Sequence, residues 1–226
     1  MAKTEERMFD CSECINTPYM SGMCSAKRQL LMKQSRHVTY EKNDILFEKD
    51  QPVNSVYILL SGKVKLTRFD EEGREQIIGI FSGGETIWEG VLVEGSTFPY
   101  EGIAMEETRV CIIEKSDFLQ VLKEPEIALS MIRLLSEKLH DANERAYLMK
   151  IRNPKARLAA FLVYRQKHET ENGVHLTLDD IAASLSLRPE TVSRKIGELL
   201  DEGVIERTGK SSIRIVNLEK LEELVP

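Results

Sequence analysis

Apolar and β-branched residues between positions 37 and 118 occur in short runs separated by glycine-containing turns. VYILLSGKVKLTRF (56–69) breaks at Ser61-Gly62, EQIIGIF (75–81) follows, and GIAMEETRVCIIE (102–114) supplies a further pair of runs. Short strands at nearly regular spacing are typical of a small antiparallel barrel or sandwich. We therefore expect residues 37–118 to form an antiparallel β-domain.

The hydrophobic period lengthens over residues 125–150, where apolar residues recur at alternating steps of four and three. Pro125 suits the first turn of a helix, and charged residues flank the apolar positions as in two-stranded coiled coils. The pattern predicts a long helix that pairs with a second copy of the chain. An amphipathic helix packed on its own core is the alternative. The predicted dimer interface consists of Ala128, Ile132, Leu135, Leu139, Ala142, Ala146 and Met149.

Residues 151–226 begin with a helical pattern, PKARLAAFLVYRQK, and a second helix is expected over residues 178–185. A third is expected over Pro189–Leu200 after a short turn, because Pro and Glu suit a helix start. ERTGKSSIRIVN, with its turn at Gly209-Lys210, predicts a β-hairpin. Two short helices, a tight turn and a hairpin make a winged helix-turn-helix.

The helix over Pro189–Leu200 has an apolar face and a polar face. Arginine can donate two hydrogen bonds to guanine, glutamate can accept one from cytosine, and the N-terminal half of a recognition helix reaches the bases. The predicted base contacts are Glu190, Ser193 and Arg194. The predicted phosphate contacts are Arg188, Thr191, Lys195, Lys210, Ser211 and Ser212.

The charge of this region does not by itself indicate DNA binding. Residues 151–226 contain twelve Lys/Arg and twelve Asp/Glu, and the whole chain has a net charge of −6. Many DNA-binding domains are basic, so a winged helix used for protein contacts is the alternative. The clustering of Arg188, Arg194 and Lys195 on one face favours DNA, with a basic surface that is local.

The four cysteines indicate metal binding or redox sensing. Cys11, Cys14 and Cys24 lie close together, whereas Cys111 lies far downstream. The chain contains no run of eighteen apolar residues, the length needed to span a bilayer. The N-terminal residues lack the apolar core of a secretory signal. We therefore expect a cytoplasmic protein without membrane contact. Disulfides are rare in that compartment, where clustered cysteines more often bind metal or respond to oxidation.

The order of β-domain, long helix and winged helix-turn-helix resembles the CRP/FNR family of bacterial transcription regulators. VYILLSGKVKLTRFDEEGREQIIGIFSGGETIW resembles its β-roll, and NPKARLAAFL and LSLRPETVSRKIGELLDEGVI resemble its DNA-binding domain. The resemblance implies an α+β fold with an N-terminal antiparallel β-roll like a cyclic-nucleotide-binding domain. The implied parts are a cysteine-bearing sensor arm (1–26), the β-roll sensor domain (27–124), a dimerisation helix (125–150) and the winged helix-turn-helix DNA-binding domain (151–226).

Glu190, Ser193 and Arg194 match the E-x-x-S-R pattern of the FNR branch. This match implies binding to palindromes of TTGA-type half-sites in double-stranded DNA by a homodimer that also contacts RNA polymerase. The sequence has no flavin, nicotinamide or nucleophile motif, so no enzyme activity is expected.

The FNR branch binds a [4Fe–4S] cluster through three N-terminal cysteines and one in the β-roll. Glu107-Thr108-Arg109-Val110-Cys111 resembles the segment that carries the fourth of them. The resemblance thus implies Cys11, Cys14, Cys24 and Cys111 as ligands of one oxygen- or redox-sensing cluster. Structural zinc and a reversible disulfide are the alternatives, and Cys111 could also be an ordinary buried strand cysteine.

The cyclic-nucleotide branch of the family has a Gly-Glu pair followed about ten residues later by Arg-Ser, whose arginine neutralises the phosphate. Here Trp88 precedes Glu89, and the matching stretch GSTFPYEG has no arginine. A buried phosphate without a cation is costly. The sequence therefore argues against cyclic AMP as a ligand.

Overall fold

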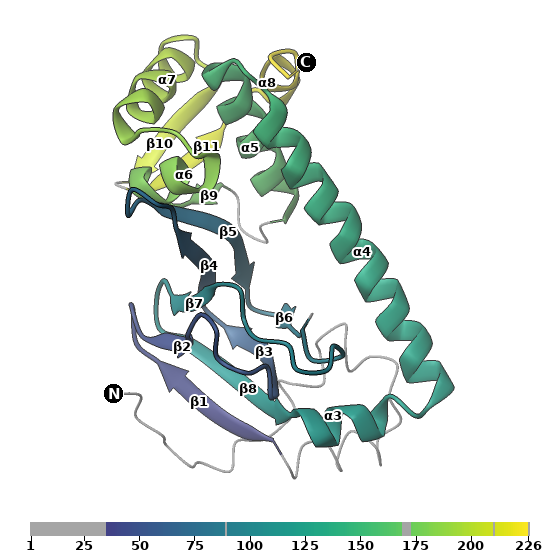
Figure 1. Ribbon diagram of the computed structural model, residues 1–226. Helices are drawn as coiled ribbons and strands as arrows, with labels where there is room; N and C mark the ends of the chain where they lie inside the picture. The colour runs from purple at the N-terminus through teal and green to yellow at the C-terminus, as the bar shows by residue number, and fades with distance from the viewer. Residues whose placement is uncertain (1–34, 89, 169–172, 210, 226) are drawn as a thin grey trace. The chain divides into compact units, whose positions relative to one another are not determined.

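The computed structural model describes residues 35–88, 90–168, 173–209 and 211–225 (Figure 1). Contacts divide the chain into two compact units. The first consists of the residues up to Arg68 together with Ile78–Lys138, and the second of Phe69–Ile77 together with Leu139–Pro226. Within the described ranges, no helix combines the length and apolar character that crossing a membrane requires.

Two four-stranded sheets form the β-domain, with strand orders β1-β8-β3-β6 and β2-β7-β4-β5. β8 lies between β1 and β3 and pairs antiparallel with both (Figure 1). β7 likewise pairs antiparallel with β2 and β4. The antiparallel β-fold that the sequence predicts is thus confirmed. The strands are β1 Arg36–Tyr40, β2 Ile45–Phe47, β3 Ser55–Ser61, β4 Lys63–Phe69, β5 Glu75–Ser82, β6 Thr86–Ile87, β7 Glu101–Ala104 and β8 Thr108–Glu114.

Aromatic side chains fill the centre of the β-domain. Phe47 stacks on Phe98 with 3.9 Å between ring centroids, and Tyr57 lies 5.1 Å from Phe47. All three side chains are buried. Gly102 of β7 leaves the space that the Phe47 ring occupies, since a Cβ atom there would lie 2.6 Å from its Cζ atom. The core thus depends on a position without a side chain.

Two helices follow β8: α3 Lys115–Val121 and α4 Pro125–Lys150. The prediction of strand up to residue 118 was wrong, because Phe118 and Val121, three residues apart, bury one helical face from Lys115 onward. Near the middle of α4, Lys138 donates to the Thr86 carbonyl oxygen at 2.7 Å. Its Nζ atom also lies 4.6 Å from the centre of the Phe81 ring of β5, so Lys138 holds α4 to β6 by a hydrogen bond and to β5 by a cation–π contact.

The second unit contains the helix-turn-helix and its hairpin. Thr177 caps α6 by accepting a hydrogen bond from the Asp180 backbone N–H, and Ser186 ends α6 in the left-handed conformation, with φ 50°. Gly203 takes the positive φ of 67° that follows α7. The predicted helices and hairpin are confirmed, with α7 one residue longer than expected. The elements are α5 Pro154–His168, β9 Val174–His175, α6 Leu178–Leu185, α7 Pro189–Asp201, β10 Ile205–Gly209, β11 Ser212–Ile215 and α8 Leu218–Glu222.

Gly102→Ala tests the close approach in the β-domain. The added methyl group would force the buried Phe47 ring to move, so the free energy of unfolding should fall by about 1–3 kcal/mol. Trp88 is the only tryptophan and is buried in the same core, so its fluorescence during urea unfolding reports this change.

Gly197→Ala in α7 is the matched control, since a Cβ atom there meets no atom within 4 Å. It should leave the Trp88 transition unchanged. An unchanged transition for Gly102→Ala as well would contradict the proposed crowding.

Candidate nucleic-acid interface

α7 has one buried face and one exposed face. Val192, Ile196 and Leu199 are at most 2% exposed. The predicted base contacts, Glu190, Ser193 and Arg194, are all exposed. An α-helix has 3.6 residues per turn. Burial of the apolar face therefore leaves Arg194 on the opposite side of α7. The packing of α7 thus leaves the side chains of the E-x-x-S-R pattern available to a groove.

The N-terminal end of α7 meets the turn after α6. Arg188 is the N-cap residue with extended backbone angles and makes no side-chain cap, and Pro189 starts the helix. Arg188 is exposed, whereas Thr191 is half-buried. Two of the predicted phosphate contacts therefore lie at the end of α7 where backbone N–H groups favour an anion.

The hairpin of β10 and β11 is stabilised by side-chain contacts across its strands. The hydroxyls of Thr208 and Ser212 are 2.7 Å apart, and Arg214 pairs with Glu206. Ser211 is exposed and Ser212 half-buried, which suits a wing beside the recognition helix. Lys210, also a predicted phosphate contact, lies outside the described residues.

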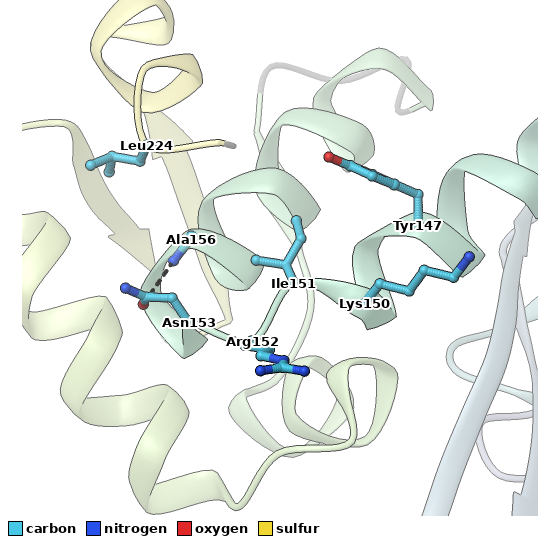
Figure 2. A pocket seen from close by; sticks show the side chains of 7 residues that line it. All are labelled: Tyr147, Lys150, Ile151, Arg152, Asn153, Ala156 and Leu224. Carbon is cyan, nitrogen blue, oxygen red and sulfur yellow. Dashed lines mark hydrogen bonds between the residues drawn. The ribbon is translucent and has the colours of Figure 1, made fainter.

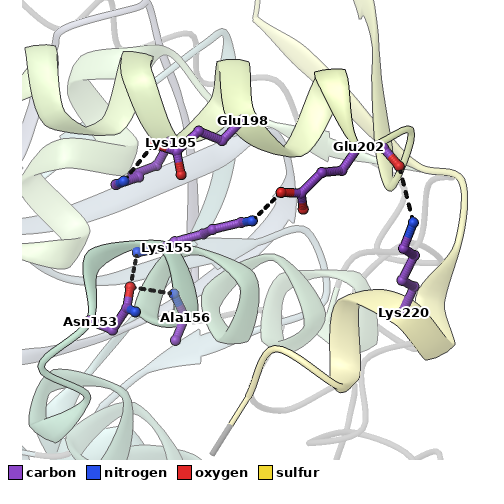
Figure 3. Close-up of polar contacts among 7 residues, drawn as sticks. All are labelled: Asn153, Lys155, Ala156, Lys195, Glu198, Glu202 and Lys220. Atoms are coloured by element: carbon purple, nitrogen blue, oxygen red, sulfur yellow. Dashed lines mark hydrogen bonds and ion pairs between the residues drawn. The ribbon is translucent and has the colours of Figure 1, made fainter.

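Ion pairs line the side of α7 that faces α5. Lys195 and Glu198 form a pair with 2.5 Å between Nζ and Oε1, and Lys155 of α5 reaches Glu202 at the end of α7, also at 2.5 Å (Figure 3). Lys220 of α8 donates to the Glu202 carbonyl oxygen at 3.4 Å. The predicted phosphate contact Lys195 is therefore already paired with a carboxylate in the chain alone.

The charges beside Glu198 favour its ionised form. The hydrogen bond from Lys195 holds the pKa of the Glu198 carboxyl below its usual range, and the positive charges of Lys195, Lys155 and Arg194 act in the same direction. This flank of α7 combines cations and carboxylates, in agreement with the neutral net charge of residues 151–226.

The start of α5 borders an open pocket of about 470 Å³ (Figure 2). Asn153 caps α5, since its Oδ1 atom accepts hydrogen bonds from the backbone N–H groups of Lys155 and Ala156. Among the described residues, the lining offers cations, a phenol, an amide and apolar groups but no carboxylate, histidine or cysteine side chain. It consists of Tyr147, Lys150, Ile151, Arg152, Asn153, Ala156 and Leu224.

A polar contact also joins α4 to α5. Tyr164 donates to Asp141 at 2.6 Å, and Arg145 pairs with the same carboxylate at 3.2 Å. The pKa of Tyr164 is raised mainly by burial of its hydroxyl and further by the hydrogen bond to Asp141. Sequence reasoning missed this contact and the Lys155–Glu202 pair, because helical periodicity assigns faces but not the partners that separate helices bring together.

The predicted dimer positions leave an apolar stripe on α4. Ile132, Leu139 and Met149 are 57%, 63% and 37% exposed. Ala142 and Ala146 are also exposed, while Ala128 and Leu135 are half-buried. The residues of this chain that the structure describes therefore leave most of the stripe uncovered.

Cys111 lies in the middle of β8, paired with His37 of β1 and Ile58 of β3, and it is fully buried. Tyr57, one residue before Ile58, faces the aromatic core, and side chains alternate along a strand. Cys111 consequently lies on the face of the sheet opposite to Tyr57, and it belongs to the buried core of the β-domain, as an ordinary strand cysteine would. Cys11, Cys14 and Cys24 lie outside the described residues. Among those described, no three His, Cys, Asp or Glu side chains are grouped as metal ligands.

The stretch matching the phosphate-binding segment of the cyclic-nucleotide branch supplies core residues instead. Phe98 is buried in the aromatic cluster, and Trp88 packs on Phe118 with 5.7 Å between ring centroids. Neither side chain offers a cation to a phosphate. Glu89, between them in sequence, lies outside the described residues.

Comparisons with known proteins agree with this architecture. Residues 37–124 match the family model described as a cyclic nucleotide-binding domain, and residues 156–224 match the Crp-like helix-turn-helix domain. The solved structure of FixK2 from Bradyrhizobium japonicum is 22% identical, with a TM-score of 0.77 over 85% of this chain and 98% of that chain. This likeness confirms the fold.

A curated relative from Escherichia coli establishes the family, and one from Pasteurella multocida agrees with it. The chain is 30% identical to the Anaerobic regulatory protein of Pasteurella multocida over 75% of its own length and 65% of that protein, just under two thirds. It is also 30% identical to the Fumarate and nitrate reduction regulatory protein of Escherichia coli K12, over 81% of this chain and 76% of that protein. The chain therefore belongs to the CRP/FNR family of DNA-binding transcription regulators.

Proposed function

We propose that this regulator is a homodimer that senses oxygen or redox state through a [4Fe–4S] cluster and binds palindromes of TTGA-type half-sites. The proposal includes four parts of the chain: the sensor arm (1–26), the β-roll (27–124), the dimerisation helix (125–150) and the DNA-binding domain (151–226). The observation on which it depends most is the exposure of Glu190, Ser193 and Arg194 on α7 above a fully buried apolar face. An α-helix with this division of faces can enter the major groove, where arginine and glutamate distinguish base pairs.

Homodimer formation is supported by the uncovered stripe on α4. Its positions alternate by four and three over three heptads, the spacing at which two helices interlock their side chains. Covering Ile132 and Leu139 would remove large exposed apolar surfaces from water. A two-fold dimer also matches a palindromic DNA site.

The sensing role is supported by the donor set and by the place of Cys111. Four thiolates are suitable ligands for an iron–sulfur cluster, and Cys111 lies on the face of its sheet opposite to Tyr57. A segment bringing Cys11, Cys14 and Cys24 to that face would complete the set. When bound, the cluster would supply chemistry that oxygen can attack, while β8 would hold Cys111 in place through its two neighbouring strands.

A thiol–disulfide switch or structural zinc using the same cysteines is the second candidate. Either site would use the cysteines clustered at Cys11, Cys14 and Cys24, with or without Cys111. The DNA-binding part would be the same in each case. The match to the cyclic nucleotide-binding domain concerns the β-fold, whereas the Trp88–Phe118 packing and the stacked Phe98 argue against a nucleotide phosphate at this place.

Contact with RNA polymerase and a cytoplasmic location follow from the family and complete the proposal. The turn between β4 and β5 is one surface available for such contact. Asp70 accepts hydrogen bonds from the backbone N–H groups of Glu72 and Arg74 and from the Arg74 side chain, so this exposed turn is well defined.

Arg194→Ala tests base readout. Loss of a bidentate contact to guanine should cost about 1–3 kcal/mol on the TTGA palindrome and relax selection at one base pair of each half-site. Fluorescence anisotropy with single-base-pair variants of the palindrome measures this. Equal losses on every duplex would contradict base readout by Arg194.

Leu139→Glu tests the dimer. A charge in the apolar stripe should convert the protein to a monomer in sedimentation, and loss of two-site binding should weaken palindrome binding roughly 100-fold or more. Leu139→Met preserves volume and apolar character and should remain dimeric. A dimeric Leu139→Glu protein would place the interface elsewhere.

Cys111→Ser tests the ligand set. Protein purified without oxygen should contain about four irons and matching sulfide per chain, and the variant should lose both together with the visible absorption. Trp88 fluorescence checks that the β-domain remains folded. Unchanged iron and sulfide in the variant would exclude Cys111 as a ligand, and zinc in place of iron in the parent protein would favour the second candidate.

A further inference from the structure

We propose that Glu198 limits the affinity of α7 for DNA of any sequence by holding Lys195 in an ion pair. This inference rests on the proposed entry of α7 into the major groove. Lysines and arginines supply the sequence-independent part of DNA binding through phosphate contacts. Base readout by the exposed face of α7 is a separate contribution.

The pair involves Lys195, for which the sequence predicts a phosphate contact. Thr191, Lys195 and Glu198 are spaced by four and three, so they lie along one side of α7, at the edge of the face that bears Arg194. The Nζ atom of Lys195 lies 2.5 Å from Oε1 of Glu198, and the two side chains are 20% and 36% exposed. Lys195 thus points its charge at a carboxylate of its own helix.

The surrounding charges reinforce the ion pair. Glu198 also experiences the positive charges of Lys155 and Arg194, and the hydrogen bond from Lys195 is the main cause of its lowered carboxyl pKa. Lys155, whose charge also acts on Glu198, is itself paired with Glu202. Glu198 therefore remains ionised at neutral pH and lies among the cations that a DNA backbone would attract.

Phosphate binding by Lys195 would require the lysine to leave Glu198 and would bring a second anion toward that carboxylate. Both effects oppose binding on every sequence equally, because the phosphates are the same in all DNA. The base contacts of Arg194 then supply a larger share of the affinity. When the contacts to the DNA backbone are weak, stable binding to DNA requires both half-sites to be bound by one dimer. Changes in the dimer then have a large effect on DNA binding.

The test compares the full chain with Glu198→Gln on two 30-base-pair duplexes, one of random sequence and one with the TTGA palindrome. The affinities for both duplexes should rise severalfold, by the same factor. The slope of log affinity against log salt should become steeper by about 0.9 for each phosphate gained. An unchanged slope would overturn the proposal, and so would a change confined to the palindrome, which would make Glu198 a base contact.

Two controls separate the ion pair from net charge. Glu219→Gln removes an exposed carboxylate of α8, outside the proposed DNA-binding face, and should leave both affinities near their original values. An equal gain from Glu219→Gln would overturn the proposal in favour of a general charge effect. The double variant Lys195→Met, Glu198→Gln should lose the gain, and persistence of the gain would overturn the role of Lys195.

Arg194→Ala distinguishes failure of this inference from failure of the proposed function. If Arg194→Ala loses discrimination between the two duplexes while Glu198→Gln changes nothing, only the inference about Glu198 fails. If Arg194→Ala has no effect on either duplex, α7 does not meet DNA, and both proposals are overturned.

Discussion

The burial of one face of α7 is the constraint on which the DNA-binding part of the molecule depends. Val192, Ile196 and Leu199 are almost fully buried, and each such side chain contributes about 1.5–3 kcal/mol relative to exposure. A surface ion pair such as Lys155–Glu202 typically contributes only about 0–1 kcal/mol. Apolar packing therefore sets the rotation of α7 about its axis, and with it the exposure of Arg194. The polar contacts adjust a helix whose orientation is already determined.

A comparable constraint governs the β-domain. β8 is paired on both sides, with β1 and β3, so Cys111 cannot shift without disturbing two hydrogen-bonded ladders. The same strand continues directly into α3, whose Phe118 is buried in one core with Ile127 and Met131 of α4. A change at Cys111 is thus linked through adjoining, closely packed elements to the start of α4. This is a physical route by which the state of a thiolate site could affect the helix that bears the apolar stripe.

Much of this architecture could be predicted from the sequence where local signals agreed. The helix over Leu178–Leu185 has apolar periodicity and a Thr cap, and the structure gives it those bounds. α3 was missed because it follows β8 without a breaker, and β9 because two residues show no alternation. The pairing of Lys195 with Glu198, three positions apart on one helix, was within reach of the sequence pattern. Lys155–Glu202 and Tyr164–Asp141 were not, since the fold brings distant segments together.

The most direct test of cluster-controlled DNA binding uses one sample purified without oxygen. Its affinity for the TTGA palindrome is measured by anisotropy before and after exposure to air, with the visible absorption recorded on the same protein. The account predicts that loss of the absorption is accompanied by a fall in affinity of roughly 5–150-fold, the usual range of coupling between two sites. An affinity that stays constant while the absorption disappears would contradict it.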